Sequence, residues 1–430
     1  MTEPEEEGIH HGHPSARLGM HTSAPQSVPV RPTQWTTSDF FFGPVLGEGL
    51  FGKVYYARCK DLLRQPNRDR DRDPSAAAQS QTSHSYRPMQ QHHMAIKVTD
   101  KQDVIKRGKV QTIMKECTLL VHFTRASSPW VVRLHASFDD PHHLFLAQEC
   151  CVGGSLRDFV HLQRNHVKHK YPKETTHDDD DDNSDSDSWV QSLGVQLLLA
   201  MEHIHAEGIV HGDLSANNVM LTPQGRIKII DFGCAIDLNT IPRTKDDTGK
   251  STAPVDIEFA GTADYIAPEV IMGSMNRTDR NKNVVGDEED YYVLAAIDLW
   301  AFACLIYFML TGESPFHSDT DQLALCKIMD HVKGTKSFIW PPCCSSHDCE
   351  AQSLVQKILI EDPSSRLGTD DKVITNESSQ YISIRRHPFF ACADWEDFSV
   401  HVPDKDENRL RNLNQLEMTD GALVDLHFFA

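Results

Sequence analysis

The chain has 430 residues, 39% of them hydrophobic, which is enough for a large core and favours two lobes over one. Its formal net charge of −20 argues against a nucleic-acid partner, because non-specific binding to nucleic acid needs a basic face. The eleven cysteines are scattered, which indicates reduced thiols and a cytoplasmic location, with the nucleus left open.

The first 35 residues are rich in His, Pro, Ser and Thr and lack periodicity, so we expect 1–35 to be a disordered tail. The acidic start MTEPEEEGIHHGH does not have the pattern of a secretory signal. The next stretch, 40–59, alternates apolar residues around glycines and predicts a strand pair. Within it LGEGLFGKV has the pattern G-x-G-x-x-G-x-V, on Gly47, Gly49, Gly52 and Val54. Such glycines let the backbone approach a phosphate, although a tight hairpin turn gives the same pattern.

A low-complexity insert is predicted at 61–93, after which MAIKVTD resumes as a strand that carries Lys97. The helical stretch 109–120 supplies Glu116, and a Lys–Glu pair could clamp the α- and β-phosphates of a nucleotide. Taken singly, Lys97 and Glu116 are each typical of an ordinary surface charge. Two more polar inserts are predicted, an acidic one at 173–188 and another at 274–290.

The stretch HGDLSANN at 211–218 places the acid Asp213 five residues before the amide Asn218, the spacing of a base and a metal ligand in protein kinases. An apolar strand then ends in Asp-Phe-Gly, where Asp231 suits a Mg²⁺ ligand. GTADYIAPE follows at 261–269.

The longest apolar run, LWAFACLIYFML at 299–310, is too short to span a bilayer and predicts a buried helix. The cluster CCSSHDC at 343–349 favours a loop of thiols over a metal site, because no second ligand pair follows at a suitable spacing.

Together these motifs, in this order, resemble the eukaryotic protein kinases over residues 36–395. GT-x-x-Y-x-x-PE is typical of Ser/Thr specificity, IRRHPFF at 384–390 resembles the AGC branch, and 97–116 is similar, without a gap, to the 3-phosphoinositide-dependent kinase family. The resemblance implies an α+β fold of two lobes, a small β-rich N-lobe and a larger helical C-lobe, with ATP and Mg²⁺ as cofactors. The PH domain of many family members has no counterpart in the C-terminal tail 396–430, so we expect no direct membrane or phosphoinositide binding.

The resemblance also implies roles for individual residues. Lys97 and Glu116 would hold the α/β-phosphates, Asp213 would orient the acceptor hydroxyl and take its proton late, and Asn218 and Asp231 would hold Mg²⁺. The nucleotide-binding set comprises Leu46, Gly47, Glu48, Gly49, Gly52, Val54, Ala95, Lys97, Gln148 (the gatekeeper), Glu149 and Cys151 (the hinge), Met220 and Asp231. Two supporting roles are implied: Glu269 would pair with Arg366, and Asp298 would brace the catalytic loop.

The chain departs from the family at four positions. Gly212 replaces the Arg that grips an activation-loop phosphate, Ile236 replaces a Lys that assists it, and Glu258 occupies the phosphoacceptor position. We therefore expect activity without loop phosphorylation, with Glu258 supplying a fixed charge. Ser215 replaces a Lys near the transferred phosphate, and losing such a cation costs about 3–4 kcal/mol, by comparison with one oxyanion donor.

A docking pocket for the Phe-rich motif of client AGC kinases is implied at Lys101, Val104, Ile105 and Leu144, although the apolar members are equally typical of ordinary core. The leading hypothesis is a Ser/Thr kinase that phosphorylates the activation loops of other AGC kinases. The alternatives are a nucleotide-binding pseudokinase scaffold and an active AGC kinase with unrelated substrates.

Overall fold

The computed structural model describes residues 35–49, 52–60, 93–170, 188–240, 253–254, 261–275, 284–285, 288–340, 346–369, 371, 381–396, 400 and 419–420. Nearly all of the predicted tail 1–35, most of the three predicted inserts and Glu258 lie outside these residues.

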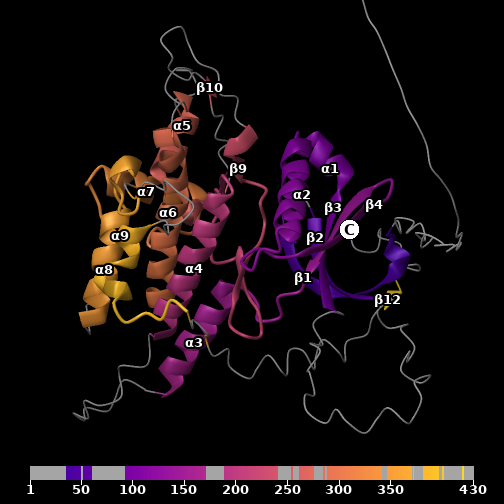
Figure 1. Cartoon of the computed structure of the whole chain (residues 1–430), viewed down its shortest axis with the longest axis horizontal. Helices are drawn as coiled ribbons and strands as arrows, with labels where there is room; N and C mark the ends of the chain where they lie inside the picture. The colour runs from indigo at the N-terminus through magenta and orange to yellow at the C-terminus, as the bar shows by residue number, and fades with distance from the viewer. Residues whose placement is uncertain are drawn as a thin grey trace, which may run out of the picture. The chain divides into compact units, whose positions relative to one another are not determined.

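The N-terminal part is an antiparallel sheet with two helices, as Figure 1 shows. Its strand order is β12-β1-β2-β3-β5-β4, and α1 and α2 connect β3 to β4. The predicted strand pair at 40–59 is thus confirmed as the β1–β2 hairpin. The elements are β1 (Phe40–Gly49), β2 (Gly52–Cys59), β3 (His93–Asp100), α1 (Lys101–Lys106), α2 (Val110–Arg125), β4 (Leu134–Asp139), β5 (His143–Glu149) and β12 (Thr419–Asp420).

Alternation along the strands separates a core face from a second face. Tyr55 and Ala57 on β2 join Ile96 on β3 in a buried cluster with four phenylalanines of β1, β4 and β5. Because successive side chains point to opposite faces, Val54 and Lys97 share the other face, and they stand opposite each other in the β2–β3 register. The sheet therefore presents the predicted nucleotide residues away from its own core.

Gly52 has a structural requirement independent of any phosphate. A Cβ at this position would lie 1.8 Å from the carbonyl oxygen of Val98 on β3. Only glycine lets β2 begin this close to its neighbour. The glycine pattern thus has a packing component, which the hairpin alternative anticipated.

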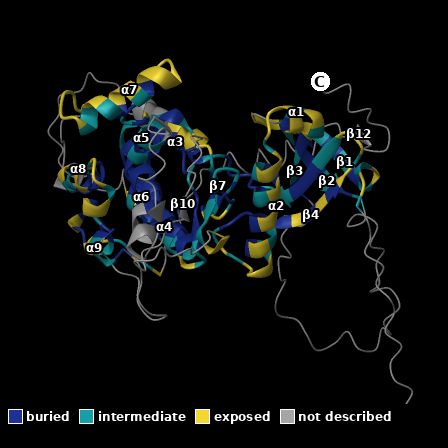
Figure 2. Cartoon of the chain, turned by 90° about the horizontal axis from the view of Figure 1, so that it is seen from above, coloured by how far each residue is buried: buried dark blue, intermediate teal, exposed yellow. Residues whose placement is uncertain are grey.

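The remaining described residues form a mainly helical part with short two-stranded ladders, and with β1–β5 they give the α+β, two-lobed fold that was predicted. Buried residues run along α4 and α6, whereas exposed residues gather on α7 and α8 (Figure 2). The helices are α3 (Leu156–Lys170), α4 (Ser188–Ala206), α5 (Pro268–Met275), α6 (Glu288–Thr311), α7 (Asp321–Val332), α8 (Ser346–Ile358) and α9 (Ile382–Arg385). The ladders pair β6 (Ile209–Val210) with β9 (Ile236–Asp237), β7 (Val219–Leu221) with β8 (Ile227–Ile229), and β10 (Ala253–Pro254) with β11 (Val284–Val285).

Helix α6 is longer than the apolar run from which it was predicted. Its segment Leu294–Thr311 has the length and hydropathy of a membrane span, but 94% of it is buried inside the protein, as in a core helix. The predicted polar insert 274–290 is correspondingly too wide, because α5 ends at Met275 and α6 begins at Glu288. Acidic residues in a first turn are stabilised by the helix dipole, which explains how a polar stretch opens this helix.

Three other predicted boundaries move by a few residues. His93 already belongs to β3, and Ser188 already begins α4. The predicted thiol loop at 343–349 is wrong in its second half, because α8 begins at Ser346. In each case the strand or helix extends into polar sequence, where composition alone marks an insert.

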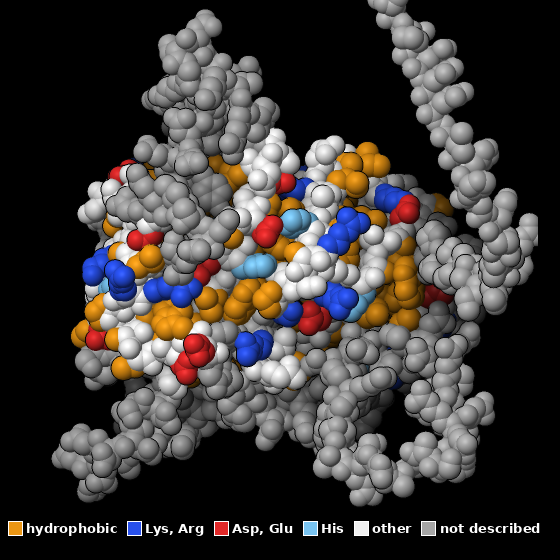
Figure 3. Space-filling view, in the orientation of Figure 1, with side chains coloured by type: hydrophobic (Ala, Val, Ile, Leu, Met, Phe, Trp, Pro, Cys, Tyr) orange, Lys and Arg blue, Asp and Glu red, His pale blue; other side chains and the backbone are white. Residues whose placement is uncertain are grey.

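The surface shown in Figure 3 mixes charges. Lys and Arg side chains lie among Asp and Glu side chains over the described part of this face, with hydrophobic side chains in separate patches. The described part of this face therefore does not gather one sign of charge.

Candidate active site

The predicted Lys–Glu pair is formed. Lys97 Nζ on β3 donates to both carboxylate oxygens of Glu116 on α2, at 2.7 and 2.9 Å. Asp231, two residues beyond β8, places Oδ2 3.5 Å from the same Nζ. The ammonium group on strand β3 is thus contacted by a side chain of helix α2 and by a side chain just beyond strand β8.

The charges of this cluster follow from burial and mutual attraction. Burial by itself lowers the pKa of Lys97, but the carboxylates of Glu116 and Asp231 outweigh it and raise that pKa. Burial raises the pKa of Asp231, yet the Lys97 charge and the Gly233 N–H more than offset this and lower it. Burial raises the pKa of Glu116 against the opposing effect of Lys97. Lys97 is therefore an ammonium and Asp231 a carboxylate at neutral pH.

The predicted nucleotide residues lie on several strands, some of them on the same sheet face as Lys97. Ala95 pairs with Gln148 across β3–β5, so both side chains are on the face of Lys97. Leu46, Gly47, Glu48 and Gly49 are exposed at the end of β1, and Met220 lies on β7.

At the predicted hinge, the N–H of Glu149 donates to the carbonyl of Arg133 at 2.8 Å, and its carboxylate lies 3.4 Å from Lys228 Nζ. Cys151, two residues on, is buried. The Glu149 N–H is thus engaged within the protein.

Asp213 and Asn218, predicted to have separate roles, are in direct contact. Asn218 Nδ2 donates to the carbonyl oxygen of Asp213 at 2.8 Å and to its Oδ2 at 3.0 Å. Since the amide nitrogen is used in this way, the amide oxygen is left as a ligand atom. Asp231 and Asn218 therefore offer oxygen donors that fit Mg²⁺, which commonly takes one or two protein ligands and completes its shell with phosphate and water.

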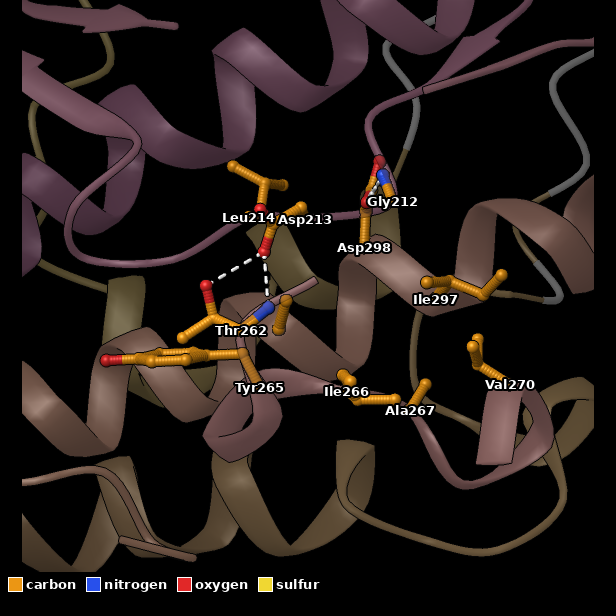
Figure 4. A pocket seen from close by; sticks show the side chains of 11 residues that line it. Gly212, Asp213, Leu214, Thr262, Tyr265, Ile266, Ala267, Val270, Ile297 and Asp298 are labelled. Carbon is orange, nitrogen blue, oxygen red and sulfur yellow. Dashed lines mark hydrogen bonds between the residues drawn. The ribbon is translucent and has the colours of Figure 1, made fainter. Parts of the chain in front are cut away.

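Thr262 holds the second carboxylate oxygen of Asp213. Its N–H and its hydroxyl both donate to Asp213 Oδ1, at 2.8 and 3.0 Å (Figure 4). Burial raises the pKa of Asp213, and these two hydrogen bonds oppose the rise. Sequence reasoning assigned Thr262 no role, although its place in the GTADYIAPE motif was the available signal.

The catalytic loop is anchored from beneath by Asp298 on α6, as predicted. The His211 N–H donates to Asp298 Oδ2 at 2.7 Å. The Gly212 N–H donates to Oδ1 at 2.9 Å (Figure 4). Gly212 has φ +74°, and a Cβ there would lie 2.7 Å from the carbonyl oxygen of Cys234. Glycine at this position therefore suits the backbone itself, beyond the loss of an arginine side chain.

The other departures divide between described and undescribed residues. Ser215 is fully buried, and its Oγ has no hydrogen-bond partner among the described residues. It does not replace the missing lysine as an exposed donor. Ile236 lies on β9, paired with Val210. Glu258 lies outside the described residues, so its predicted role is not tested.

The supporting ion pair is formed as the resemblance implied. Arg366, which is 1% exposed, donates from both terminal nitrogens to the two oxygens of Glu269, each at 2.7 Å. Such bidentate geometry is the strong form of an arginine–carboxylate contact. It ties α5, which begins within the GTADYIAPE motif, to the turn that carries Arg366.

The predicted docking residues differ in exposure. Val104 is buried, Leu144 is half-buried and Ile105 is 65% exposed. Lys101 Nζ donates to Asp139 Oδ2 at 2.5 Å and to the Asp140 carbonyl at 2.6 Å. The core interpretation therefore fits Val104, whereas Ile105 is free to meet a partner.

Comparisons with known proteins agree with this geometry. The protein kinase domain model matches residues 78–382. The chain is 29% identical to the serine/threonine-protein kinase SCH9 of Candida albicans, over 83% of this chain and 34% of that protein. It is 29% identical to the RAC family serine/threonine-protein kinase homolog of Dictyostelium discoideum, over 85% and 61%.

A third relative is the mouse 3-phosphoinositide-dependent protein kinase 1, at 26% identity over 89% of this chain and 52% of that protein. These curated relatives are longer, and the chain spans between about a third and three fifths of their length. The relatives bear out the resemblance to AGC-branch Ser/Thr kinases. The family model covers well over half of the sequence, so the chain belongs to the protein kinase family.

Proposed function

We propose that the protein is a Ser/Thr kinase that transfers the γ-phosphoryl group of Mg-ATP to a protein hydroxyl. The observation that carries this proposal is the intact Lys97–Glu116–Asp231 cluster, with an ammonium held by two carboxylates at 2.7 and 3.5 Å. Proteins that have lost phosphoryl transfer commonly lack one of these groups, whereas here all three are in contact.

Each residue has a definite task in this reaction. Lys97, oriented by Glu116, would hold the α- and β-phosphates, and Asp231 with Asn218 would hold Mg²⁺, which would supply positive charge against the negative charge of the phosphates. Asp213 accepts a hydrogen bond from the acceptor hydroxyl and takes its proton late. Thr262 donates to one carboxylate oxygen of Asp213. The other oxygen accepts a hydrogen bond from the Asn218 amide and remains to accept one from the hydroxyl of the substrate.

We further propose that the substrates are the activation loops of other AGC kinases, docked through a Phe-rich motif at Lys101, Ile105 and Leu144. The similarity to a 3-phosphoinositide-dependent protein kinase supports this substrate class, and the exposed Ile105 supports the docking surface. Lys101 is already paired with Asp139, so the pocket favours an apolar motif over a phosphorylated one. We propose a cytoplasmic location, with the nucleus as an alternative.

Independence from loop phosphorylation is part of the proposal. Glu258 supplies one negative charge in place of a phosphate, and Gly212 lacks the side chain that would grip that phosphate. The left-handed backbone at Gly212 is held by Asp298, which supports a catalytic loop whose conformation does not depend on an activation-loop phosphate.

A pseudokinase scaffold is the second candidate, and Ser215 favours it. Its buried hydroxyl leaves the position near the transferred phosphate without the usual cation. Slower chemistry, by about a hundred- to a thousandfold, would follow if nothing else supplied that charge.

The test is Mg-ATP-dependent transfer by the purified chain to a client AGC kinase and to a short activation-loop peptide, beside Asp231→Asn. The proposal is supported if the wild-type chain phosphorylates the client kinase and the peptide and Asp231→Asn phosphorylates neither. The scaffold is supported if the wild-type chain binds ATP but neither it nor the variant transfers phosphate. Ile105→Glu then tests docking, because it changes an exposed side chain. It should slow transfer to the client kinase and spare the peptide, whereas equal loss on both would contradict the docking surface. Unchanged transfer to the client would also contradict the docking surface, whereas transfer to generic peptides but to neither the client nor the activation-loop peptide would point to unrelated substrates.

A further inference from the structure

A buried series of hydrogen bonds reaches the backbone of the catalytic loop through Asp298 on α6. The hydroxyl of Tyr381, just before α9, lies 2.5 Å from Nδ1 of His205 on α4. Nε2 of His205 lies 2.8 Å from Oδ2 of Asp298, the carboxylate that holds the loop amides. Tyr381 is 5% exposed, and His205 and Asp298 are each 1% exposed. Water therefore has almost no access to these three hydrogen-bonded side chains.

The chemistry of the three groups sets the direction of donation. The Asp298 carboxylate only accepts hydrogen bonds, so His205 must carry its proton on Nε2 and donate it. In the neutral imidazole Nδ1 is then the acceptor, and the Tyr381 hydroxyl is the donor. Tyr381 thus favours the one tautomer of His205 that attracts Asp298. The opposite tautomer would turn a lone pair toward the carboxylate and repel it.

The backbone of Tyr381 is a second, independent observation. Its φ is +56°, in the left-handed region, and only two other described residues that are not glycine share a positive φ, Ser127 and Asp231. A bulky residue in this region is strained and persists where its surroundings fix it. One of the other two, Asp231, belongs to the active site. The strain at Tyr381 is accounted for if its ring and hydroxyl must reach His205.

We propose that Tyr381 is a positioning residue for the catalytic loop. It acts through His205 on Asp298, which keeps the His211 and Gly212 amides fixed and Asp213 aimed at the acceptor. The proposed effect of Tyr381 on catalysis rests on the proposed kinase function. Its proposed effect on the mobility of the His211 and Gly212 amides does not depend on that function.

The experiment compares Tyr381→Phe with the matched control Tyr307→Phe in the full chain. Tyr307 is also buried, and its hydroxyl donates to the Ile339 carbonyl at 2.6 Å, in a different hydrogen-bond set. Tyr381→Phe should lower kcat about three- to tenfold with both KM values within about twofold, since it disturbs orientation and leaves binding intact. Hydrogen exchange of the peptide 209–218 should become faster in Tyr381→Phe and stay unchanged in Tyr307→Phe.

Equal effects of the two variants on kcat and on exchange would overturn the proposal and leave Tyr381 an ordinary buried side chain. If the wild-type chain transfers no phosphate, the kinase function fails, and hydrogen exchange still decides whether Tyr381 positions the loop. If Tyr381→Phe does not fold, nitrogen-15 spectra of histidine-labelled wild type decide instead. A proton on Nε2 of His205 supports the proposal, and a proton on Nδ1 alone overturns it.

Discussion

The two sides of the candidate active site are built on different principles. On the nucleotide side, Lys97, Glu116 and Asp231 attract one another directly through side-chain charges at 2.7 and 3.5 Å. On the acceptor side, the loop that carries Asp213 is held through its backbone, by Asp298 beneath His211 and Gly212. The departures from the family pattern at Gly212 and Ser215 fall on this second side, within the loop that carries Asp213.

The difference shows which parts of such a site tolerate change. On the nucleotide side, the charged side chains predicted to meet phosphate and metal are all present and in contact with one another. The loop can lose a phosphate-gripping arginine when buried hydrogen bonds already fix its backbone. Four predictions probe this contrast.

The largest effect is expected from Asp298→Asn. This change leaves one oxygen where two backbone N–H groups and His205 now donate, so we expect a loss of about 2–4 kcal/mol in the free energy of unfolding and a marked fall in kcat. Chemical unfolding and steady-state kinetics measure the two effects. Unchanged kcat would mean that the acceptor side does not depend on its backbone anchor.

The pH dependence of that loss follows from the pKa of Asp298. Burial raises this pKa, but the hydrogen bond from His205 and the neighbouring donors outweigh burial and lower it. The stabilisation is therefore complete above the unfolded pKa of about 3.9 and is lost as the pH falls through the lower folded value. The difference between wild type and Asp298→Asn should be constant near neutral pH and shrink in strong acid.

Restoring a side chain at position 212 should harm the protein. Gly212→Ala forces a left-handed backbone on a residue with a Cβ, at about 1–2 kcal/mol, and brings that Cβ to 2.7 Å from the Cys234 carbonyl. Gly212→Arg restores the family's cation but meets the same obstruction, so we expect slower transfer from both variants. Activity and thermal unfolding measure the outcome.

Gly334→Ala is the matched control, because Gly334 has φ +67° and no atom lies within 4 Å of its Cβ position. It should show the conformational cost without the contact, and kcat should be unaffected. A gain in activity from Gly212→Arg would contradict the idea that backbone anchoring has replaced the phosphate grip.

Thr262→Val should shift the pH profile with a moderate effect on rate. Burial raises the pKa of Asp213, and the Thr262 hydroxyl helps to oppose that rise, so removing the hydroxyl raises the pKa further. Asp213 acts as a carboxylate, and activity falls as the pH drops through its pKa. The acid limb of the kcat/KM profile should therefore move to higher pH. In Thr311→Val, which loses a hydroxyl bonded to the Tyr307 carbonyl, the limb should stay in place.

The smallest effect is expected from Ser215→Ala. The Oγ of Ser215 is buried without a hydrogen-bond partner among the described residues, so its removal sacrifices no contact there and relieves a desolvated hydroxyl. Stability should stay the same or rise by up to about 1 kcal/mol, with kcat within about twofold. A fall in kcat well beyond that would show that the hydroxyl contacts substrate in the complex.

Local features of this protein could be predicted from its sequence to different degrees. The β1–β2 hairpin, the helix of Glu116 and the buried helix at 299–310 follow from apolar periodicity, and the structure confirms them. The edges of the predicted inserts were less accurate, because polar residues also open helices and strands. The role of Glu258 stays a prediction, outside the described residues.

What the sequence determined by itself was the order and type of the chemical groups, since motif spacing and residue type are properties of the chain. The tertiary structure alone decided which distant groups share a proton or a backbone amide. Thr262 reaches Asp213 across 49 residues, and Tyr381 reaches His205 across 176. It also decided that position 212 takes a left-handed backbone against the Cys234 carbonyl. Such contacts depend on how buried segments pack in three dimensions, and no local pattern of side chains specifies that packing.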